Sequence, residues 1–533
     1  MLVSNVLTYA VHSLWEYKLV FPTALAAYLL ACQTDKYIKS PFRKQGIPGP
    51  FLAKFTNFYR AYYTIKRTWH RDLMAMHEKY GPVVWIAPDE VSCSDPFLRN
   101  QIYSFANDKK EETFFRKAPS YETGSVNEDF SFIFEREPEK ARLGKKYMSH
   151  FYSESYLTKL EGNFDQAVDE FVQGMDQHIV GPSKVCNMTS WIEYYMWDAT
   201  SQIACNLSTG FCLAGKDLWS TLFGLRVIIQ VVGCLMTIPQ SLLITTRWIR
   251  RMLLVYFLDQ LYFTAMGIGA QKWKTPLSDR IEEIKIEAPN HLLAKFHSAQ
   301  EHMRGVFPHG DMTQGSTIQF FNLMAGSIGV ASHPTVKAIH ELIANPEMLA
   351  RVREELSALD GDLDFAAFVH RGGSNKVPYL EAAINEAIRL TPAAGFTLSR
   401  VSPPAGCQLN EFFIPPGYVV GMNPWPINYD TGYFGPDAAE FKPDRWLGNH
   451  PTQMIDGMPR TMKNYIEAGW LSFGAGGRVC IGRHLAVFLM FKIISKMVMT
   501  YDFELIKAPE ESFALIVELI GMEVMVKHRE VSV

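Results

Sequence analysis

The sequence lacks the features that mark several common classes of protein. Its 533 residues include eight cysteines, but no C-x-x-C pair and no spacing typical of a zinc site. So few scattered thiols in a long chain favour a reducing compartment over a disulfide framework. A formal net charge of only −3 gives no indication of a nucleic-acid-binding protein. Internal repeats, low-complexity segments and a G-x-G-x-x-G loop after a strand are also missing from the sequence.

Apolar and aromatic residues, in contrast, are abundant, at 48% and 13% of the chain. Such a chain can bury a large core and still enclose an apolar cavity. From about residue 140 to residue 360, apolar residues recur at three- and four-residue steps, which predicts helices. Residues 83–87 and 90–94 predict a hairpin, and short β-like segments separated by Pro/Gly turns begin at about residue 395. The predicted fold is therefore mainly α with a small β portion.

The N-terminus is apolar, but the apolar run at residues 19–32 is shorter than the about 20 residues that span a bilayer. Extending the run backwards adds the length but also includes charged residues. Four basic residues follow between positions 36 and 44, and they favour a cytosolic location for the rest of the chain. We expect a membrane anchor at residues 1–34, with a soluble helix as the alternative, then a basic, proline-rich hinge at 35–50 and a single domain at 51–533.

Residues 218–264 form the most apolar internal stretch, and arginines interrupt both halves of it. One interpretation is a pair of buried helices. The other is a lid over a lipophilic pocket that also dips into a membrane surface.

A cysteine in a glycine-rich loop carries the strongest chemical signal. The loop reads Phe473-Gly-Ala-Gly-Gly-Arg-Val-Cys-Ile-Gly482 and is followed by a helix-like run. Its glycines let backbone amides approach the sulfur without an intervening Cβ, and a following helix N-terminus favours thiolate over thiol. Arg478 can pair with an anionic group of a cofactor. A structural cysteine in a turn is the alternative.

The loop resembles the signature of the cytochrome P450 family, F-x-x-G-x-R-x-C-x-G. All five fixed positions match, at Phe473, Gly476, Arg478, Cys480 and Gly482. The resemblance implies the P450 fold, in which a large helical domain encloses haem b. It also implies that Cys480 binds the haem iron and that Phe473, Gly476 and Arg478 contact the cofactor.

Further matches follow in the order of the family. Glu386-Ala-Ile-Arg389 resembles the E-x-x-R pair, and residues 441–446 resemble the P-E-R-F region, whose arginine would be Arg445. The resemblance implies that Glu386, Arg389 and Arg445 form a buried network supporting the haem core. Residues 47–50 resemble the proline-rich hinge that follows a microsomal anchor.

Phe396-x-Leu398-x-Arg400 and the last third of the chain look most like fungal secondary-metabolism members of the pisatin-demethylase type. The implied enzyme is a monooxygenase of the endoplasmic reticulum with its catalytic domain facing the cytosol. Its substrate would be a lipophilic terpenoid, polyketide or alkaloid. A thiolate ligand favours O–O cleavage, and the electrons would come from an NADPH-cytochrome P450 reductase, which carries the flavins. Four basic residues could steer an acidic partner: Lys145, Lys146, Arg478 and Arg483.

The stretch Met324-Ala-Gly-Ser-Ile-Gly-Val-Ala-Ser332 departs from the family's A/G-G-x-D/E-T-T/S motif. The acid and the threonine become Ile328 and Gly329 in one alignment, or Gly329 and Val330 in another. Either Ser327, Ser332, water or a substrate hydroxyl supplies protons, or the protein is a haem-thiolate isomerase, dehydratase or cyclase. A non-catalytic haem-binding protein is the third possibility. Pro334 should kink this helix.

A second departure concerns the cations expected at the haem propionates. Where the family places Trp or His four residues before an Arg, this chain has Ala141 and Lys145. Lys145, Arg142 and Arg400 are the candidate replacements, with lysine acting as a point charge rather than a fork. The substrate pocket should be lined by residues 218–264 together with four others: Phe396, Leu398, Met324 and Ala325.

Overall fold

The computed structural model describes residues 31–104, 112–124, 131, 133–181, 184–237, 284–303, 312–359, 363–368, 375–447, 453–455, 458–460, 470–513 and 515–530. The α-helices are α3 (Pro41–Lys44), α4 (Phe58–Ile65), α5 (Trp69–Tyr80), α6 (Arg99–Ile102), α7 (Pro138–Met148), α8 (Glu154–Leu157), α9 (Glu161–His178), α10 (Met188–Cys205), α11 (Phe211–Ala214), α12 (Thr221–Thr237), α16 (Leu292–Met303), α17 (Met312–Gly326), α18 (Ser332–Ala344), α19 (Pro346–Ser357), α20 (Phe365–Phe368), α21 (Pro378–Leu390), α22 (Pro424–Asn428), α23 (Thr431–Phe434) and α25 (Arg483–Thr500). Short 3₁₀ turns include η4 (Pro119–Gly124), η9 (Pro443–Trp446) and η10 (Gly476–Arg478), and η8 (Ser327–Ala331) is a π-helical turn.

The strands are short and form several small sheets, so the predicted mainly α fold is confirmed. They are β1 (Val83–Ala87), β2 (Glu90–Cys93), β3 (Arg116–Lys117), β4 (Val185–Asn187), β5 (Arg400–Val401), β6 (Cys407–Leu409), β7 (Phe412–Ile414), β8 (Val419–Gly421), β9 (Gln453–Ile455), β10 (Met458–Arg460), β11 (Tyr501–Lys507), β12 (Glu510–Phe513), β13 (Val517–Ile520) and β14 (Glu523–His528).

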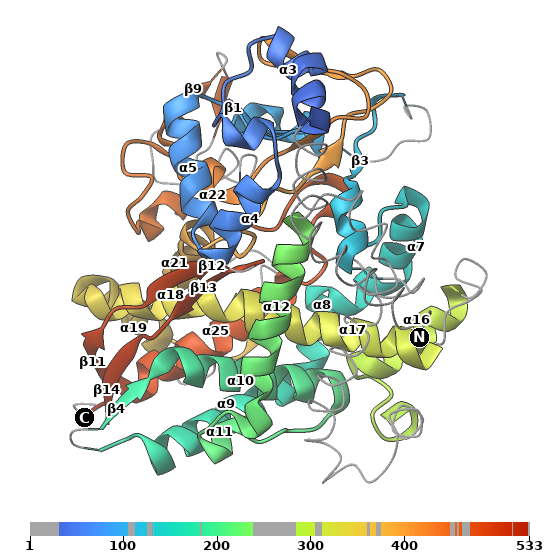
Figure 1. Cartoon of the computed structure of the whole chain (residues 1–533). Coiled ribbons are helices and arrows are strands. Elements are labelled where there is room, and N and C mark those ends of the chain that lie inside the picture. The colour runs from blue at the N-terminus through green and yellow to red at the C-terminus, as the bar shows by residue number, and fades with distance from the viewer. Residues whose placement is uncertain are drawn as a thin grey trace, which may run out of the picture.

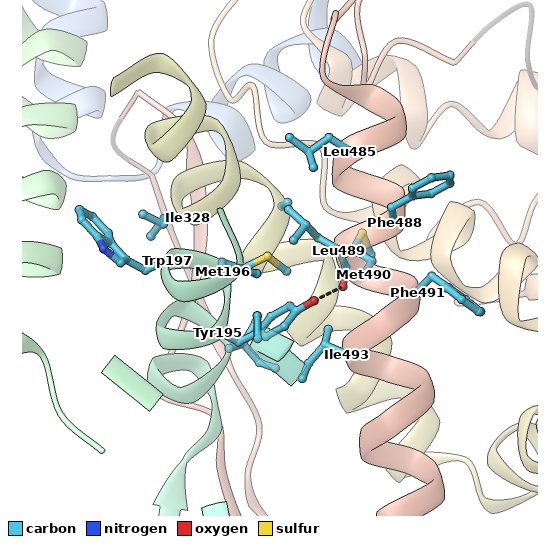
Figure 2. Close-up of a cluster of buried hydrophobic side chains, with 14 of the residues drawn as sticks. Tyr195, Met196, Trp197, Ile328, Leu485, Phe488, Leu489, Met490, Phe491 and Ile493 are labelled. Carbon is cyan, nitrogen blue, oxygen red and sulfur yellow. Dashed lines mark hydrogen bonds between the residues drawn. The ribbon is translucent and has the colours of Figure 1, made fainter. Parts of the chain in front are cut away.

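The helical core forms around α10, which is buried along nearly its whole length, and α25, which is buried over most of its middle part. Helices of this kind have no side to present to water and must be enclosed by other elements. Figure 2 shows the contact between the two: Tyr195 of α10 donates a hydrogen bond to the carbonyl of Leu489 of α25, at 3.2 Å. Ile328 of the π-helical turn lies in the same cluster, beside Trp197.

The largest sheet has the strand order β1-β2-β8-β5-β3. The predicted hairpin at residues 83–94 is confirmed as its antiparallel β1–β2 pair. The segment expected to be a hinge packs onto this sheet, because the amide of Trp85 donates to the carbonyl of Pro48 at 2.7 Å. Gly49 allows that approach, since a Cβ there would overlap the carbonyl of Trp85.

A long helical segment, α17–η8–α18, runs through the middle of the molecule, and α12 lies across it (Figure 1). We call this segment the central helix. It continues through Pro334, and its departure from α geometry lies directly upstream, in the π-helical turn. Proline cannot donate the backbone hydrogen bond that an α-helix expects, and π turns commonly mark such irregularities.

The expected anchor falls almost wholly on residues 1–30, outside the described part of the chain, and residues 31–39 are helical. Among the helices in the described ranges, none combines the length and the apolar content that crossing a bilayer requires. The apolar stretch at 218–264 is described only as far as residue 237, where it contains α12. One side of α12 is buried in the core, while Phe223, Val227 and Val231 remain exposed.

Candidate functional site

The cysteine loop places Cys480 between η10 and the start of α25. The amide of Cys480 donates to the carbonyl of Phe473 at 2.8 Å, which closes the loop. Gly476 has a φ of +60°, and a Cβ at this position would overlap the carbonyl of Tyr103. The glycine is therefore required both for the left-handed backbone and for close packing.

The thiol of Cys480 differs from the other cysteines. All eight cysteines lie in the described ranges, and only Cys480 is exposed. The surrounding protein still raises the pKa of this thiol by desolvation, while a hydrogen bond from the amide of Gly482 and the charges of Lys145 and Arg483 act in the opposite direction. A bound metal ion deprotonates a thiol outright, so an accessible sulfur among cations can serve as a thiolate ligand.

Next to the loop lies a cavity of about 240 Å³ with a strongly basic lining. Five cations line it: Lys117, Arg142, Lys145, Arg400 and Arg478. No carboxylate is among the described residues that line it. Such a cavity suits a ligand with more than one negative charge, and the two propionates of haem b meet that requirement.

Arg400 is buried in β5 and is held by neutral partners. Its guanidinium donates to the carbonyls of Leu398 at 3.3 Å and Ser399 at 3.0 Å. It also lies over the ring of Tyr103 at 4.9 Å, and it bonds the hydroxyl of Tyr121. These contacts fix the direction of the cation without cancelling its charge.

Arg478 and Lys145 also bond carbonyl oxygens. Arg478 donates to the carbonyls of Glu135 at 3.0 Å and Arg136 at 3.2 Å, and Lys145 donates to that of Val479 at 2.6 Å. Burial lowers the pKa of Arg478 to about 10 and that of Lys145 to about 8. Both groups are therefore still mainly charged at neutral pH and can attract an anion.

Lys117 also lines the basic cavity, although its role was not predicted from the sequence. It pairs directly opposite Arg400 across β3 and β5, and both side chains are buried. Burial lowers the pKa of Lys117 well below its usual range. The charges of Arg478 and Arg400 contribute to that lowering, so a nearby anion is needed for Lys117 to keep its own charge beside Arg400. No local motif signals Lys117, because its neighbour lies almost 300 positions later in the chain.

The predicted candidates for the propionates thus divide into two groups. Arg400, Lys145 and Arg478 converge on the cavity. Arg142 stands at its rim with an exposed side chain and forms an ion pair with Glu139 at 2.8 Å.

Glu386 lies at the centre of a buried ionic network. Its carboxylate accepts hydrogen bonds from Arg389 at 2.7 and 2.8 Å, from Nε of Arg445 at 3.2 Å, and from Nε1 of Trp446 at 2.9 Å. All three charged side chains are at most 4% exposed. The spacing of Glu386 and Arg389 places them on one face of α21, while Arg445 and Trp446 arrive from η9.

Asn428 connects this network to the cysteine loop. Arg389 donates to the carbonyl of Asn428 at 2.6 Å, and the Asn428 amide group donates to the hydroxyl of Ser472 at 2.8 Å. Ser472 directly precedes Phe473, the first residue of the loop. Neither Asn428 nor the indole of Trp446 was expected to take part, although Trp446 belongs to the matched 441–446 region.

The central helix holds both predicted serines, and both are buried. Ser327 donates to the carbonyl of Leu323 at 3.0 Å, and Ser332 donates to that of Ile328. Each hydroxyl therefore bonds the turn that precedes it in its own helix. Ile328, which aligns with the family's acid in one of the two alignments, is a core residue that is 3% exposed.

The residues predicted to line a substrate pocket occupy different surroundings. Met324 is buried, and Ala325 is half-buried on the same turn of the central helix. Phe396 is half-buried, with its ring 6.5 Å from that of Tyr121. Leu398 lies nearer the basic cavity, since its carbonyl accepts from Arg400.

Comparisons with known proteins agree with this geometry. The Cytochrome P450 family model matches residues 47–522. A protein named "Cytochrome P450 monooxygenase pkfB", from Emericella nidulans, is 29% identical, over 91% of this chain and 91% of its own length. "Cytochrome P450 monooxygenase asR2" from Sarocladium schorii is 25% identical, over 91% of this chain and 92% of its own. "Cytochrome P450 monooxygenase cicH" from Emericella nidulans is 27% identical, over 89% and 91%.

Proposed function

The chain belongs to the cytochrome P450 family, and from that premise we propose a haem-thiolate monooxygenase that oxidises a lipophilic small molecule in fungal secondary-metabolite biosynthesis. The observation that carries the proposal is the accessible thiol of Cys480 next to a cavity lined by cations.

In this proposal Cys480 binds the iron of haem b, and Arg400, Arg478, Lys145 and Lys117 neutralise its propionates. The Glu386 network supports the cysteine loop through Asn428 and Ser472. When bound, haem b supplies the centre at which O₂, two electrons and two protons give one oxygen atom to the substrate and one to water.

The two electrons come from a separate NADPH-dependent flavoprotein reductase, since the sequence has no nucleotide-binding loop of its own. Arg478 and Lys145 face the cofactor cavity, so the steering of an acidic partner falls to exposed Lys146 and Arg483. Arg483 begins α25, directly after the cysteine loop. This position is consistent with an electron entry point near Cys480.

Membrane association is supported by two neighbouring apolar faces. On α4, Phe58, Tyr62 and Ile65 share one side of the helix and are each more than half exposed. On α12, Phe223 is exposed to a similar extent. The two helices touch, since Gln230 donates to the carbonyl of Thr64 at 3.4 Å. An exposed apolar area of this kind is typical of a surface that contacts lipid, here on the cytosolic side of the endoplasmic reticulum.

A spectroscopic experiment tests the haem assignment. The reduced protein with carbon monoxide should show the red-shifted Soret band of a thiolate ligand, and Cys480→Ala should abolish it. Cys32→Ala, at a half-buried cysteine far along the chain from the loop, is the matched control and should keep the band. If Cys480→Ala kept the band, the assigned ligand would be wrong.

A second candidate function, isomerisation, dehydration or ring closure at the haem, is favoured by one observation. The central helix carries no acid or threonine at positions 328–330, and Ile328 packs in the core. Product formation that requires NADPH, reductase and O₂ supports the monooxygenase. Conversion without reductase supports the second candidate, and no turnover across a broad panel favours a non-catalytic haem protein.

A further inference from the structure

We infer that Tyr103 is a positioning residue for the cofactor, because it fixes Arg400, on one wall of the basic cavity, relative to the cysteine loop on the other wall. The inference deepens the proposed function and rests on it. Tyr103 directly follows α6, is 3% exposed, and lines the cavity. Three parts of this residue make the contacts that support the role: its hydroxyl, its ring and its backbone carbonyl.

The hydroxyl of Tyr103 is inserted between two segments that would otherwise bond each other. β5 and β8 run antiparallel with Arg400 opposite Val420, so Leu398 lies opposite Met422 two residues further along. The amide of Leu398 donates to the carbonyl of Met422 at 2.9 Å, as an antiparallel ladder requires. The return bond is replaced by the hydroxyl, which accepts from the amide of Met422 at 2.8 Å and donates to the carbonyl of Leu398 at 2.9 Å.

This insertion makes the carbonyl of Leu398 a shared acceptor. Besides the bond from Tyr103, it accepts one from the guanidinium of Arg400 at 3.3 Å, and its two lone pairs allow both bonds to form at once. Burial raises the pKa of the Tyr103 hydroxyl, while the charge of Arg400 acts in the opposite direction. The hydroxyl therefore stays protonated at physiological pH and remains a donor. It helps to fix the acceptor that holds Arg400.

The ring of Tyr103 contacts Arg400 directly. The guanidinium carbon of Arg400 lies over the ring, 4.9 Å from its centroid. Both residues are buried, and a cation–π contact is worth more where water is excluded. The ring limits the directions in which the guanidinium can point and leaves its positive charge available for an anion.

The backbone carbonyl of Tyr103 packs against the cysteine loop. Gly476, with its φ of +60°, approaches so closely that an added Cβ would overlap the carbonyl oxygen of Tyr103. Gly476 belongs to the loop that carries Cys480, and Arg478 of the same loop also lines the cavity. One residue thus contacts both the segment that carries Arg400 and the loop that carries Cys480.

The bound cofactor would be held at two points by groups that Tyr103 connects. In the proposed function Cys480 binds the iron and Arg400 neutralises a propionate, so the two groups must keep one separation. Tyr103 fixes them relative to each other before haem b arrives. Such preorganisation should slow the dissociation of haem, because a cation that is already held in place loses little freedom on binding.

Transfer of haem from the holoprotein to apomyoglobin tests the inference. Tyr103→Phe, which removes only the hydroxyl, should accelerate the loss of haem by about fivefold, the effect of one hydrogen bond. Tyr103→Leu, which also removes the ring, should accelerate it by a further factor of about five. Buried Tyr501 supplies the matched control, because its hydroxyl donates to Asp176 at 2.8 Å and it lies at the opposite end of α25 from Cys480. Tyr501→Phe should lose haem at the wild-type rate.

A double-mutant cycle separates positioning from general support of the fold. Because the ring acts through the cation of Arg400, the difference in rate between Tyr103→Phe and Tyr103→Leu should largely disappear in an Arg400→Gln background. A purely structural role of the ring would leave the full difference in both backgrounds. All rates are compared at a temperature well below the unfolding midpoint of every variant.

Wild-type rates of haem loss in both Tyr103 variants, with normal carbon monoxide spectra, would overturn the inference. A difference between the Phe and Leu variants that persists in full without Arg400 would also overturn it. If Tyr103→Leu fails to fold, Tyr103→Phe and Tyr501→Phe decide alone, and equal rates in these two would contradict the role of the hydroxyl. A wild-type protein that takes up no haem would instead overturn the proposed function, so the two failures are distinguishable.

Discussion

The cysteine loop and the central helix both carry chemistry in this family, but they are built in different ways. The loop depends on local requirements, such as a left-handed glycine at position 476 and a thiol next to the start of α25. The central helix has lost the family's polar pair, and its surface at Gly329 is completed by side chains from α12 and the β12–β13 hairpin. Local requirements leave a motif in the sequence. Contacts between distant segments do not.

Glu386→Gln should have the largest effect of the tests on this comparison. Removing one partner from a buried ion pair leaves the other charge uncompensated, which costs about 3–5 kcal/mol of unfolding free energy. We expect little haem-loaded protein on expression, measured by the ratio of Soret to protein absorbance. Glu139→Gln removes a carboxylate from an ion pair with the same three-residue spacing, but its side chain is 54% exposed, so the loss should stay below about 1 kcal/mol. Equal losses in the two variants would remove the support for a special role of the Glu386 network.

The next largest effect should be on the pH dependence of stability, and it comes from His333 in the central helix. Its pKa is about 3 in the folded protein against an ordinary value of 6.5, so the unfolded chain binds more protons between these limits. Stability therefore falls as the pH drops from 6.5, by about 2 kcal/mol at about pH 5. His333→Gln should flatten this dependence in denaturant unfolding. Buried His77, whose pKa is lowered to about 4, contributes with the same sign, so part of the acid loss should remain. An unchanged slope in His333→Gln would show that His333 is not held neutral.

The third prediction concerns Arg400, in the basic cavity next to the cysteine loop. Arg400→Gln should accelerate the loss of haem by about tenfold, because it removes one charge-assisted hydrogen bond to the cofactor. Transfer of haem to apomyoglobin measures the rate. Arg142→Gln is the matched control, since Arg142 also borders the cavity but is 61% exposed and paired with Glu139. If the two variants lost haem equally fast, the division between the rim and the interior of the cavity would be wrong.

The sequence allowed the family, the mainly α fold and the β1–β2 hairpin to be predicted, and these predictions are confirmed. The geometry around Glu386, Arg389 and Arg445 also follows the motifs, because the spacing of the first two fixes their relation on one helix. Their role in supporting haem, like the role of each predicted site residue, stays a prediction.

Other parts of the site could not be predicted because they depend on strand register and tertiary packing. Lys117 meets Arg400 only through the register of β3 and β5, and Asn428 reaches Ser472 only once α22 is in place. The contact of Ile516 with Gly329, where an added Cβ would lie 2.6 Å from Cδ1 of Ile516, joins residues almost 190 positions apart, and no spacing rule relates them.

Ser327→Ala and Ser332→Ala should have the smallest effects. A side chain that acts as the sole proton donor in a reaction typically contributes at least about a hundredfold to its rate. Both hydroxyls already donate to carbonyls of the preceding turn. We therefore expect each substitution to change turnover much less, about as much as the loss of any hydroxyl hydrogen bond to a helix carbonyl. Thr335→Val is the control for that loss, because Thr335 donates to the carbonyl of Ala331 at 2.7 Å in the same helix. Turnover and its solvent isotope effect should be measured with the cognate reductase. A hundredfold loss in one serine variant, absent from Thr335→Val, would identify that serine as the proton donor and would make the central helix as dependent on a single side chain as the cysteine loop.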